Sequence, residues 1–406
     1  MGVCGTGIQK GNELMDKRIL MISDNMIFGF GGGSLEEHKY YDGLRYYANT
    51  HHDELKVLSI DTQFEDTFSQ PIKKTRMIDM IARVCGHSSY MFVAWLQYRS
   101  DVLAYRPDLI VLGRSRMGFI AKDIRKYLPE CKIVCNMENV ELDYVDGYFA
   151  NKQNFLKFLY VQWEKMCVKR DEAHAIQYSH ALDYLTNRDY NRAHELYFVR
   201  EKQEMILPIC IEKATTLIKE SEHKTVVFIG SLNYGSNVNA LMEFIKNVWT
   251  PYFSGSKEIS FVIGGCNPNE SLKQMVKEIP NCFIYENFTY LNDIVPKGAM
   301  VIAPIQKGAG MKVKVAETLS MGLLIAASDE ALVGYEKALE GDQLNSIIRC
   351  NTSEEYMNAI LLYCDKTEEE LEKISEQNKK LYQELYSYEV SRKAIANLCD
   401  RMLIGD

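Results

Sequence analysis

A glycine-rich segment near residue 308 carries the residue types that hold a bound anion. Gly308-Ala309-Gly310-Met311 follows a continuous apolar run, Met300 to Ile305, and precedes apolar residues at helical spacing. A glycine loop that opens a helix after a strand presents backbone N–H groups and the positive end of the helix dipole. Positive charge comes from Lys307, Lys312 and Lys314, and Glu317 follows one turn into the expected helix. The segment therefore predicts a site for a nucleotide diphosphate, with an i,i+3 surface ion pair as the alternative for Lys314 and Glu317.

A second glycine loop lies near the amino terminus. Gly31-Gly32-Gly33 stands between an expected strand, Lys17 to Asp24, and a helical pattern from Leu35 to about Asn49. The glycines nearly fit the dinucleotide pattern GxGxxG, and Asp61 ends the next expected strand, where a ribose-binding acid would lie. Because Gly29 and Asp61 are further apart than the usual ~20 residues, a loop lining an interdomain cleft is favoured over a dinucleotide site or a bare turn.

Polar residues also follow the expected strand Cys131 to Met137. They are Glu138, Asn139 and Glu141. Ligands of open α/β sheets bind beyond the carboxyl ends of parallel strands, so these side chains are predicted to contact a substrate. The alternative is that the two glutamates cap a helix or pair with the region Arg114–Arg116.

The elements that would position these residues alternate between strands and helices in both halves of the chain, which indicates two Rossmann-like domains facing a cleft. In the first half we expect further strands over 56–61 and 108–113, helices over 115–128, 154–170 and Ala181 to Phe198, and a closing segment over 203–209. In the second half we expect strands over 226–229, 259–265, 282–286, 300–305, 323–327 and 346–349, then a helical tail over 353–403. The heptad-like run 371–385 is expected to pack on the domain, with pairing to a partner as the alternative.

These patterns predict a domain organisation. We expect a flexible extension over residues 1–17, a first Rossmann-like domain over 18–211, a polar linker over 212–224 and a second Rossmann-like domain over 225–386. A C-terminal helix over 387–406 completes the chain, and a return to the first domain is one alternative for it. Residues 2 and 4 formally fit lipidation patterns, but an extension before the first strand is the favoured interpretation.

The composition narrows the class of protein. The chain has 406 residues, 47% of them hydrophobic, and a net charge of −8, which argues against nucleic acid as a partner. Its 11 cysteines include no CxxC pair and indicate reduced thiols rather than a metal cluster. No apolar run reaches the length of a membrane span and no signal peptide opens the chain, so a cytoplasmic protein is expected.

One stretch could touch a membrane surface. Residues 72–105 combine basic residues with Tyr90, Met91, Phe92, Trp95 and Tyr98. Such a basic and aromatic stretch suits peripheral contact with an anionic membrane, at the inner face of the cell membrane. The alternative is a packed helix pair with a charged edge.

The second half resembles the group 1 (family 4) glycosyltransferases, which have the GT-B fold. The resemblance rests on Phe228–Asn233, Asn237–Leu241, Gly264-Gly265 and, above all, Pro304–Ser328; in the first half Gly31–Gly33, Glu138–Glu141 and Trp163-Glu164 occupy similar places. It implies an enzyme that moves a sugar from a UDP- or GDP-linked donor to a saccharide, lipid-linked or protein acceptor in surface glycan synthesis, commonly with retention and without a metal or cofactor.

The resemblance also implies roles for individual residues. Glu317 would bind the ribose hydroxyls, and the donor phosphates and sugar would lie against the remaining donor-side residues, Gly32, Gly33, Gly230, Ser231, Gly308, Ala309, Gly310, Met311, Lys312 and Lys314. Lys312 would stabilise the leaving diphosphate and Glu138 would act in catalysis. The acceptor side would come from Gly31, Asn139 and Glu141.

The chain departs from the family pattern at three places. Ala309 stands where members often carry a second glutamate, Glu138 replaces a frequent histidine, and Asn233 and Asn237 stand near the position of a usual basic pair. Two other functions therefore stay open: a nucleotide-sugar 2-epimerase of the same architecture, and a non-catalytic glycosyltransferase-like subunit.

Overall fold

The computed structural model describes residues 16–29, 31–61, 65–68, 74–149, 155–213, 216–286, 288 and 290–405. Most of the expected N-terminal extension and residues 72 and 73 lie outside this part of the chain. None of the described helices combines the length and apolar content needed to cross a membrane.

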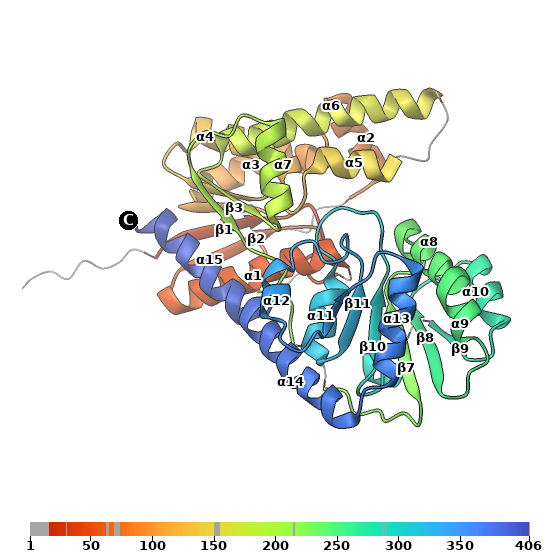
Figure 1. Cartoon of the computed structure of the whole chain (residues 1–406). Coiled ribbons are helices and arrows are strands. Elements are labelled where there is room, and N and C mark those ends of the chain that lie inside the picture. Colours follow the sequence, from red (N-terminus) through yellow and green to blue (C-terminus); the bar gives the residue numbers. More distant parts are fainter. Residues whose placement is uncertain are drawn as a thin grey trace, which may run out of the picture.

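The first half forms a parallel sheet of six strands in the order β2-β1-β3-β4-β5-β6 (Figure 1). The strands are β1 (Arg18–Ile22), β2 (Glu54–Leu58), β3 (Leu109–Leu112), β4 (Lys132–Asn136), β5 (Ala181–Tyr184) and β6 (Gln203–Ile206). Alternate residues of β1 point to opposite faces, with Ile19 and Met21 in one apolar cluster and Leu20 and Ile22 in the other. Both faces are thus covered, and the carboxyl ends of the strands meet at one edge.

Helices cover both faces of this sheet. They are α1 (Gly32–His51), α2 (Arg76–Val84), α3 (Met91–Tyr105), α4 (Gly118–Tyr127), α5 (Glu141–Phe149), α6 (Phe155–Tyr178) and α7 (Asn187–Leu196). The strand order reverses between β2-β1 and β3, so the glycine loop before α1 lies at a switch point of the sheet, where open α/β folds bind ligands.

The second half forms another parallel six-stranded sheet, in the order β12-β11-β10-β7-β8-β9. Its strands are β7 (Lys224–Ile229), β8 (Ile259–Gly265), β9 (Cys282–Glu286), β10 (Met300–Ala303), β11 (Leu324–Ala327) and β12 (Ile347–Arg349). Its helices are α8 (Gly235–Phe244), continued through a π-helical turn into α9 (Thr250–Phe253), then α10 (Glu270–Lys277), α11 (Val313–Met321), α12 (Glu336–Gly341), α13 (Ser353–Cys364) and α14 (Glu368–Leu385). The six strands predicted for this half are confirmed, because each is a short apolar run bounded by turn residues.

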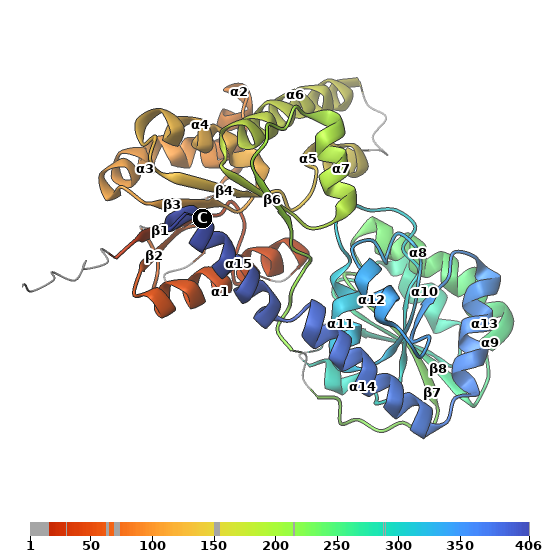
Figure 2. The same ribbon diagram turned by 60° about the vertical axis from the view of Figure 1, so that its left-hand side comes forward.

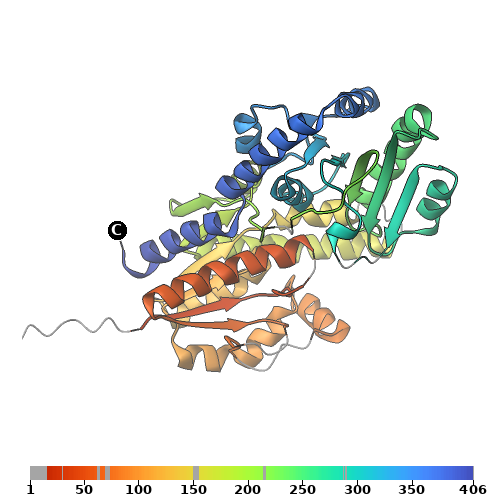
Figure 3. The ribbon, with the colours of Figure 1, turned by 90° about the horizontal axis from the view of Figure 1, so that it is seen from below.

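The last helix, α15 (Tyr388–Leu403), returns to the first half and lies alongside α1, as Figure 3 shows. Arg392 binds Asp42 at 2.8 Å through two parallel bonds, and the Tyr47 hydroxyl lies 3.1 Å from Asp400. Gly43 of α1 provides the space for Ile395 of α15, because a Cβ there would collide with it. The preceding helix, α14, buries Ile374, Asn378, Leu381 and Tyr382 and contacts α11. The chain thus crosses between the halves twice.

One secondary-structure prediction is wrong. The helix expected over Ala181 to Phe198 begins only at Asn187, because Ala181–Tyr184 forms the fully buried strand β5 between β4 and β6. The Thr186 hydroxyl then accepts a hydrogen bond from the Asp189 amide and starts α7. A four-residue strand that contains an aspartate, directly before a helical pattern, does not by itself reveal this boundary.

The aromatic part of residues 72–105 does not face a membrane, which corrects that expectation for α3. Tyr90, Met91, Trp95 and Tyr98 are buried in the first domain, and the Trp95 indole donates to Asp123 at 2.9 Å. The packed-helix alternative therefore describes α3. Helix α2, which precedes it, is largely exposed.

Candidate active site

The loop that precedes α11 reaches across to the first domain. Gly310 has φ of +62°, a left-handed conformation that favours glycine. A Cβ at this position would collide with the side-chain oxygen of Asn139, which follows β4. Glycine is therefore required twice at residue 310, once by the backbone and once by the close approach of the two domains.

Two helix N-termini face each other at this crossing. A Cβ at Gly32, the first residue of α1, would lie 3.7 Å from the Val313 side chain, the first residue of α11. Neither helix has a side chain that caps its first turn. Unsatisfied N–H groups and the positive ends of two helix dipoles thus converge on one place, which suits a bound anion.

Lys312 holds the glycine loop rather than pointing into open space. Its ammonium donates to the carbonyl oxygens of Ala309 and Gly310 at 3.2 and 2.8 Å and lies 3.1 Å from the Glu330 carboxylate. Arg188 of the first domain binds the same carboxylate at 2.8 Å. Burial lowers the pKa of Lys312, against the raising effect of Glu330. Its charge is therefore already matched within the protein.

Lys314 is a cation of a different kind. Its ammonium lies 4.1 Å from the centre of the Phe228 ring and donates to the Asn237 side chain at 3.3 Å. It also lies 3.1 Å from where a Cβ of Gly230 would be, so it underlies the loop after β7. Burial lowers its pKa to about 7. Among the described residues no carboxylate comes within ion-pair distance of it, so the i,i+3 pair with Glu317 is not formed.

Glu317 lies one turn further along α11 and is half-buried. Within the described part of the chain, its carboxylate has neither a hydrogen-bond partner nor an ion pair. Burial raises its pKa, while the charge of Lys314 opposes that rise. A half-buried acceptor without a partner is what a hydroxyl-bearing ligand would satisfy.

Glu138 faces the glycine loop of the first domain from the end of β4. Its φ is +24°, unusual for a residue with a side chain, and a Cβ at Gly33 would lie 3.0 Å from its Oε1. Its Oε2 lies 3.7 Å from Arg114 and makes no hydrogen bond to the described residues. Burial raises the pKa of Glu138 to about 7, although Arg114 opposes that rise. The carboxyl group can therefore change its protonation near neutral pH.

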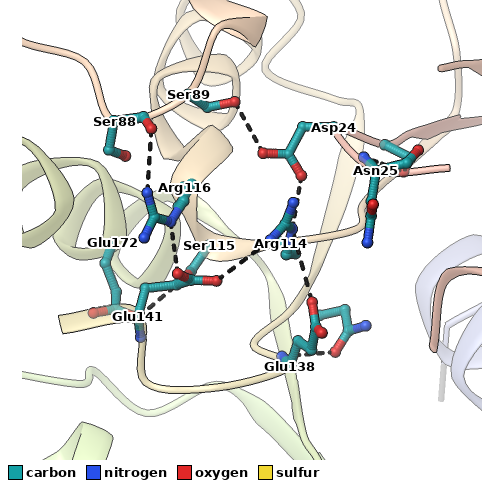
Figure 4. Close-up of polar contacts among 12 residues, drawn as sticks. Asp24, Asn25, Ser88, Ser89, Arg114, Ser115, Arg116, Glu138, Glu141 and Glu172 are labelled. Atoms are coloured by element: carbon teal, nitrogen blue, oxygen red, sulfur yellow. Dashed lines mark hydrogen bonds and ion pairs between the residues drawn. The ribbon is translucent and has the colours of Figure 1, made fainter. Parts of the chain in front are cut away.

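A buried charge network stands behind Glu138 (Figure 4). Arg114 binds Asp24 at 2.7 Å, and the Ser89 hydroxyl donates to the same carboxylate at 2.9 Å. Burial alone would raise the pKa of Asp24, but Arg114 holds it below its usual value. Arg116 binds Glu141 at 2.6 Å, so the ion-pair alternative describes Glu141. The network fixes the residues that follow β1, β3 and β4.

Two cavities adjoin these residues. One, of about 430 Å³, lies between the domains and is lined by Tyr144 and Arg188 on one side and by Tyr234 and the 307–309 loop on the other. The second, of about 370 Å³, lies within the first domain beside the charge network. A larger cavity of about 780 Å³ lies at the opposite end of the second sheet, and none of the site residues above lines it. Its size does not make it the reaction site, since the polar groups that could serve chemistry lie elsewhere.

Part of the sequence is similar to a known protein family. Residues 223–365, from just before β7 to just after α13, match the family model Glycosyl transferases group 1. The match therefore lies within the second domain. No curated protein is significantly similar to the sequence.

Solved structures agree on the fold. A glycosyltransferase from Rickettsia africae has 11% identity and a TM-score of 0.66, covering 97% of this chain and 100% of its own. WaaG, a glycosyltransferase involved in lipopolysaccharide biosynthesis, has 13% identity and a TM-score of 0.63, and the match covers 95% of this chain and 100% of WaaG. Anabaena HepE in complex with UDP has 9% identity and a TM-score of 0.60, covering 94% and 99%. The chain therefore has the GT-B fold.

Most residues predicted from the sequence lie at the domain boundary of this fold. Gly32, Gly33, Glu138 and Asn139 come from the first domain, and the 308–312 loop and Val313 approach them from the second. Ser231 lies in the loop after β7, where its carbonyl accepts from Asn237 at 3.0 Å. Glu141 is turned into the charge network instead of toward the glycine loops. Within the described residues no set of three or more metal-ligating side chains gathers into a metal site.

Several further residues of the candidate site were not predicted to belong to it. Asp24, Arg188 and Glu330 were not singled out from the sequence. Arg114 and Arg116 were named only as alternative partners of the two glutamates, and Asn237 only as a departure from the family pattern. Asp24 and Arg114 follow directly after buried strands, and the same reasoning that selected Glu138 could have found them. Arg188 and Glu330 lie on different domains, and no sequence pattern predicts their pairing.

Proposed function

We propose that the protein transfers a sugar from a nucleotide-sugar donor to a saccharide, lipid-linked or protein acceptor in surface glycan synthesis. The observation that carries the proposal is the facing of two uncapped helix N-termini, at Gly32 and Val313, with Lys314 and Glu317 on the same helix. An anionic diphosphate suits the helix ends, and a ribose suits the acceptor group one turn further on. A uridine donor is favoured, because HepE, of the same fold, binds UDP.

The chemistry requires stabilisation of the leaving group. When the bond between the anomeric carbon and the phosphate oxygen breaks, negative charge grows on the diphosphate. In this proposal, that charge is held by the N–H groups of the two helix ends and by the ammonium of Lys314, which lies beside Asn237 and the Phe228 ring. The proposed reaction therefore draws its positive charge from the protein and needs no metal or cofactor, with retention at the anomeric carbon as in the family it resembles.

The first domain supplies the acceptor side in this proposal. The space around Gly31 is open, so reacting groups can approach the backbone closely there, and Asn139 lies where the loop of the second domain meets the first domain. The backbone of Glu138 is strained, and burial raises the pKa of its carboxyl to about 7. In this proposal the carboxyl group hydrogen-bonds the transferred sugar or the incoming hydroxyl. Its supporting network keeps it oriented. We propose a cytoplasmic location, in keeping with the free thiols of the described cysteines.

Titration calorimetry with UDP and GDP tests the donor site. The wild-type protein should bind one of them, and Glu317→Ala should weaken that binding at least about tenfold, since hydrogen bonds to charged groups contribute ~1.5–3 kcal/mol. Glu340→Ala, an exposed residue of α12, is the matched control and should bind like the wild type. Equal affinity of Glu317→Ala and the wild type would refute the assignment.

Product analysis then separates the enzyme classes. With the preferred donor, slow hydrolysis or transfer should give a free or transferred sugar whose anomeric configuration, read by NMR, matches that of the donor. Release of an epimerised sugar without any acceptor would indicate the epimerase reaction. Binding without turnover in the presence of candidate acceptors would indicate a non-catalytic subunit.

A further inference from the structure

Helix α2 turns an apolar face away from the protein. Met77, Met80, Ile81 and Val84 follow the i, i+3, i+4, i+7 spacing of one helix face and are 64%, 62%, 41% and 77% exposed. Only Ala82 of this helix is buried. Because a surface helix normally directs its apolar stripe to the core, the outward stripe of α2 indicates a surface that is covered by something else.

The N-terminal half of α6 extends this apolar surface. Its exposed side chains are Phe155, Leu156, Phe158, Leu159, Tyr160 and Trp163. The Trp163 indole donates to the Arg83 carbonyl at 2.8 Å, and Arg83 binds Glu164 at 2.9 Å, so the two helices form one unit. Figures 1 and 2 show α2 and α6 together at the outer end of the first domain, with the start of α6 projecting from it. We call this surface, formed by residues 76–84 and 155–163, the α2–α6 face.

The charge around the α2–α6 face is opposite to that of the whole chain. Residues 76–84 and 155–163, with Lys74 and Glu164 at their edges, carry four lysines and arginines and two acidic residues, a net of +2, whereas the chain has a net charge of −8. Both acidic residues, Asp79 and Glu164, lie within ion-pair distance of Arg83. Lys74, Arg76 and Lys157 lie at the solvent-exposed edge. An apolar surface with a cationic edge complements an anionic lipid surface.

We infer that the α2–α6 face seats the protein on an anionic membrane surface. A second copy of this chain fits less well, because a two-fold contact would place the same cationic edges against each other. The mixture of methionine, leucine and aromatic side chains suits insertion at the level of the lipid headgroups. In this arrangement the α2–α6 face contacts the lipid, and the second domain lies in the aqueous phase.

The α2–α6 face also leads into the site. The cavity of about 370 Å³ beside the charge network is lined by Lys74, Arg83 and Tyr160 from the two helices and by Asp24 and Arg114 from the strand ends. A polar headgroup carried by a lipid in the membrane could enter it without the lipid tail leaving the bilayer. This step rests on the proposed function: if the protein is a glycosyltransferase, its acceptor is borne by a lipid.

Flotation of the full chain with vesicles tests the inference. Vesicles of phosphatidylcholine alone are compared with vesicles containing about a third phosphatidylglycerol, at low and at raised salt. The wild type should float with the anionic vesicles and far less with the neutral ones. The double variant Met80→Asp with Val84→Asp, and separately Phe158→Asp, should reduce binding at least about tenfold, because they place charges in the apolar contact. The matched control is Leu361→Asp with Leu362→Asp on the exposed face of α13, which should float like the wild type.

The outcomes separate this inference from the proposed function. Failure of the wild type to float with anionic vesicles, or undiminished flotation of the α2 and α6 variants, would overturn the docking surface. A concentration-dependent dimer that the same variants abolish would assign the face to a second copy instead. Each variant is also titrated with UDP and melted, and unchanged values show that the fold and donor site are intact. Vesicle binding by a wild type that binds no nucleotide would leave the docking surface standing and the proposed function refuted.

Discussion

The ammonium of Lys312 lies 3.1 Å from the carboxylate of Glu330, and this pair decides which lysine is available to a ligand. The same carboxylate binds Arg188 across the domain boundary, so both cations are already matched. The ammonium of Lys314, two residues further on, contacts the face of the Phe228 ring and the side-chain oxygen of Asn237 instead of a carboxylate. Lys312 was predicted from the sequence as the group that stabilises the leaving diphosphate, whereas the geometry favours Lys314.

The first prediction ranks the two lysines. Lys314→Met should weaken UDP binding by roughly ten- to a hundredfold, because a charge-assisted hydrogen bond contributes ~1.5–3 kcal/mol. Lys312→Met should weaken it less and should instead lower the melting temperature, since it releases the loop and leaves Glu330 with Arg188 alone. Calorimetry and thermal melting of both variants measure the ranking. A larger binding loss in Lys312→Met would restore the leaving-group role to that residue.

The second prediction concerns the pH dependence of UDP binding. Burial lowers the pKa of Lys314 to about 7, so the amine is neutral in the free protein above neutral pH. A bound diphosphate favours the ammonium, so binding above about pH 7 must take up a proton, and affinity should fall as pH rises. Titrations at about pH 8 in buffers of different ionisation enthalpy measure that uptake. Lys314→Arg, whose charge is fixed, is the control and should take up none; uptake equal to the wild type would contradict the assignment.

Much of the fold could be predicted from the sequence, because the patterns that indicate strands and turns are local. Strands such as Leu109–Leu112 are short apolar runs, and the glycines before α1 and α11 mark strand-to-helix turns. The site was only partly predictable. Residues at strand ends, such as Glu138, could be selected from position alone, but the pairing of Glu330 with Arg188 depends on how two domains meet. The burial of Trp95 depends on packing in the same way, because the same pattern of aromatic and basic residues occurs both on protein surfaces and in protein cores.

The third prediction concerns stability at Glu138. Its carboxyl has a pKa raised by burial to about 7 from an ordinary 4.5, so the folded state holds the proton more tightly than the unfolded state. This group therefore contributes most to stability below about pH 4.5, and that contribution is lost as pH rises to about 7. Glu138→Gln removes the dependence and should be more stable than the wild type by up to ~3 kcal/mol at about pH 8.

Urea unfolding of both proteins at about pH 5 and pH 8 measures the Glu138 effect. The difference in unfolding free energy between variant and wild type should shrink toward the lower pH. Other buried carboxyls, such as Asp183 and Glu172, have pKa values raised in the same direction, but they are common to both proteins and cancel in the comparison. A difference that does not change with pH would show that Glu138 is ionised throughout, held by Arg114.

The last prediction tests the crossing of the domains at Gly310. Gly310→Ala should cost roughly 1–2 kcal/mol for a side chain in the left-handed conformation, plus the collision of its Cβ with the Asn139 oxygen. Asn139→Ala removes the collision but not the backbone strain. In a double-mutant cycle, the second substitution should therefore recover part of the stability and of the donor turnover that Gly310→Ala loses. Strictly additive effects would show that the loop and the first domain do not meet at this point in solution, and that the cleft is more open than the structure places it.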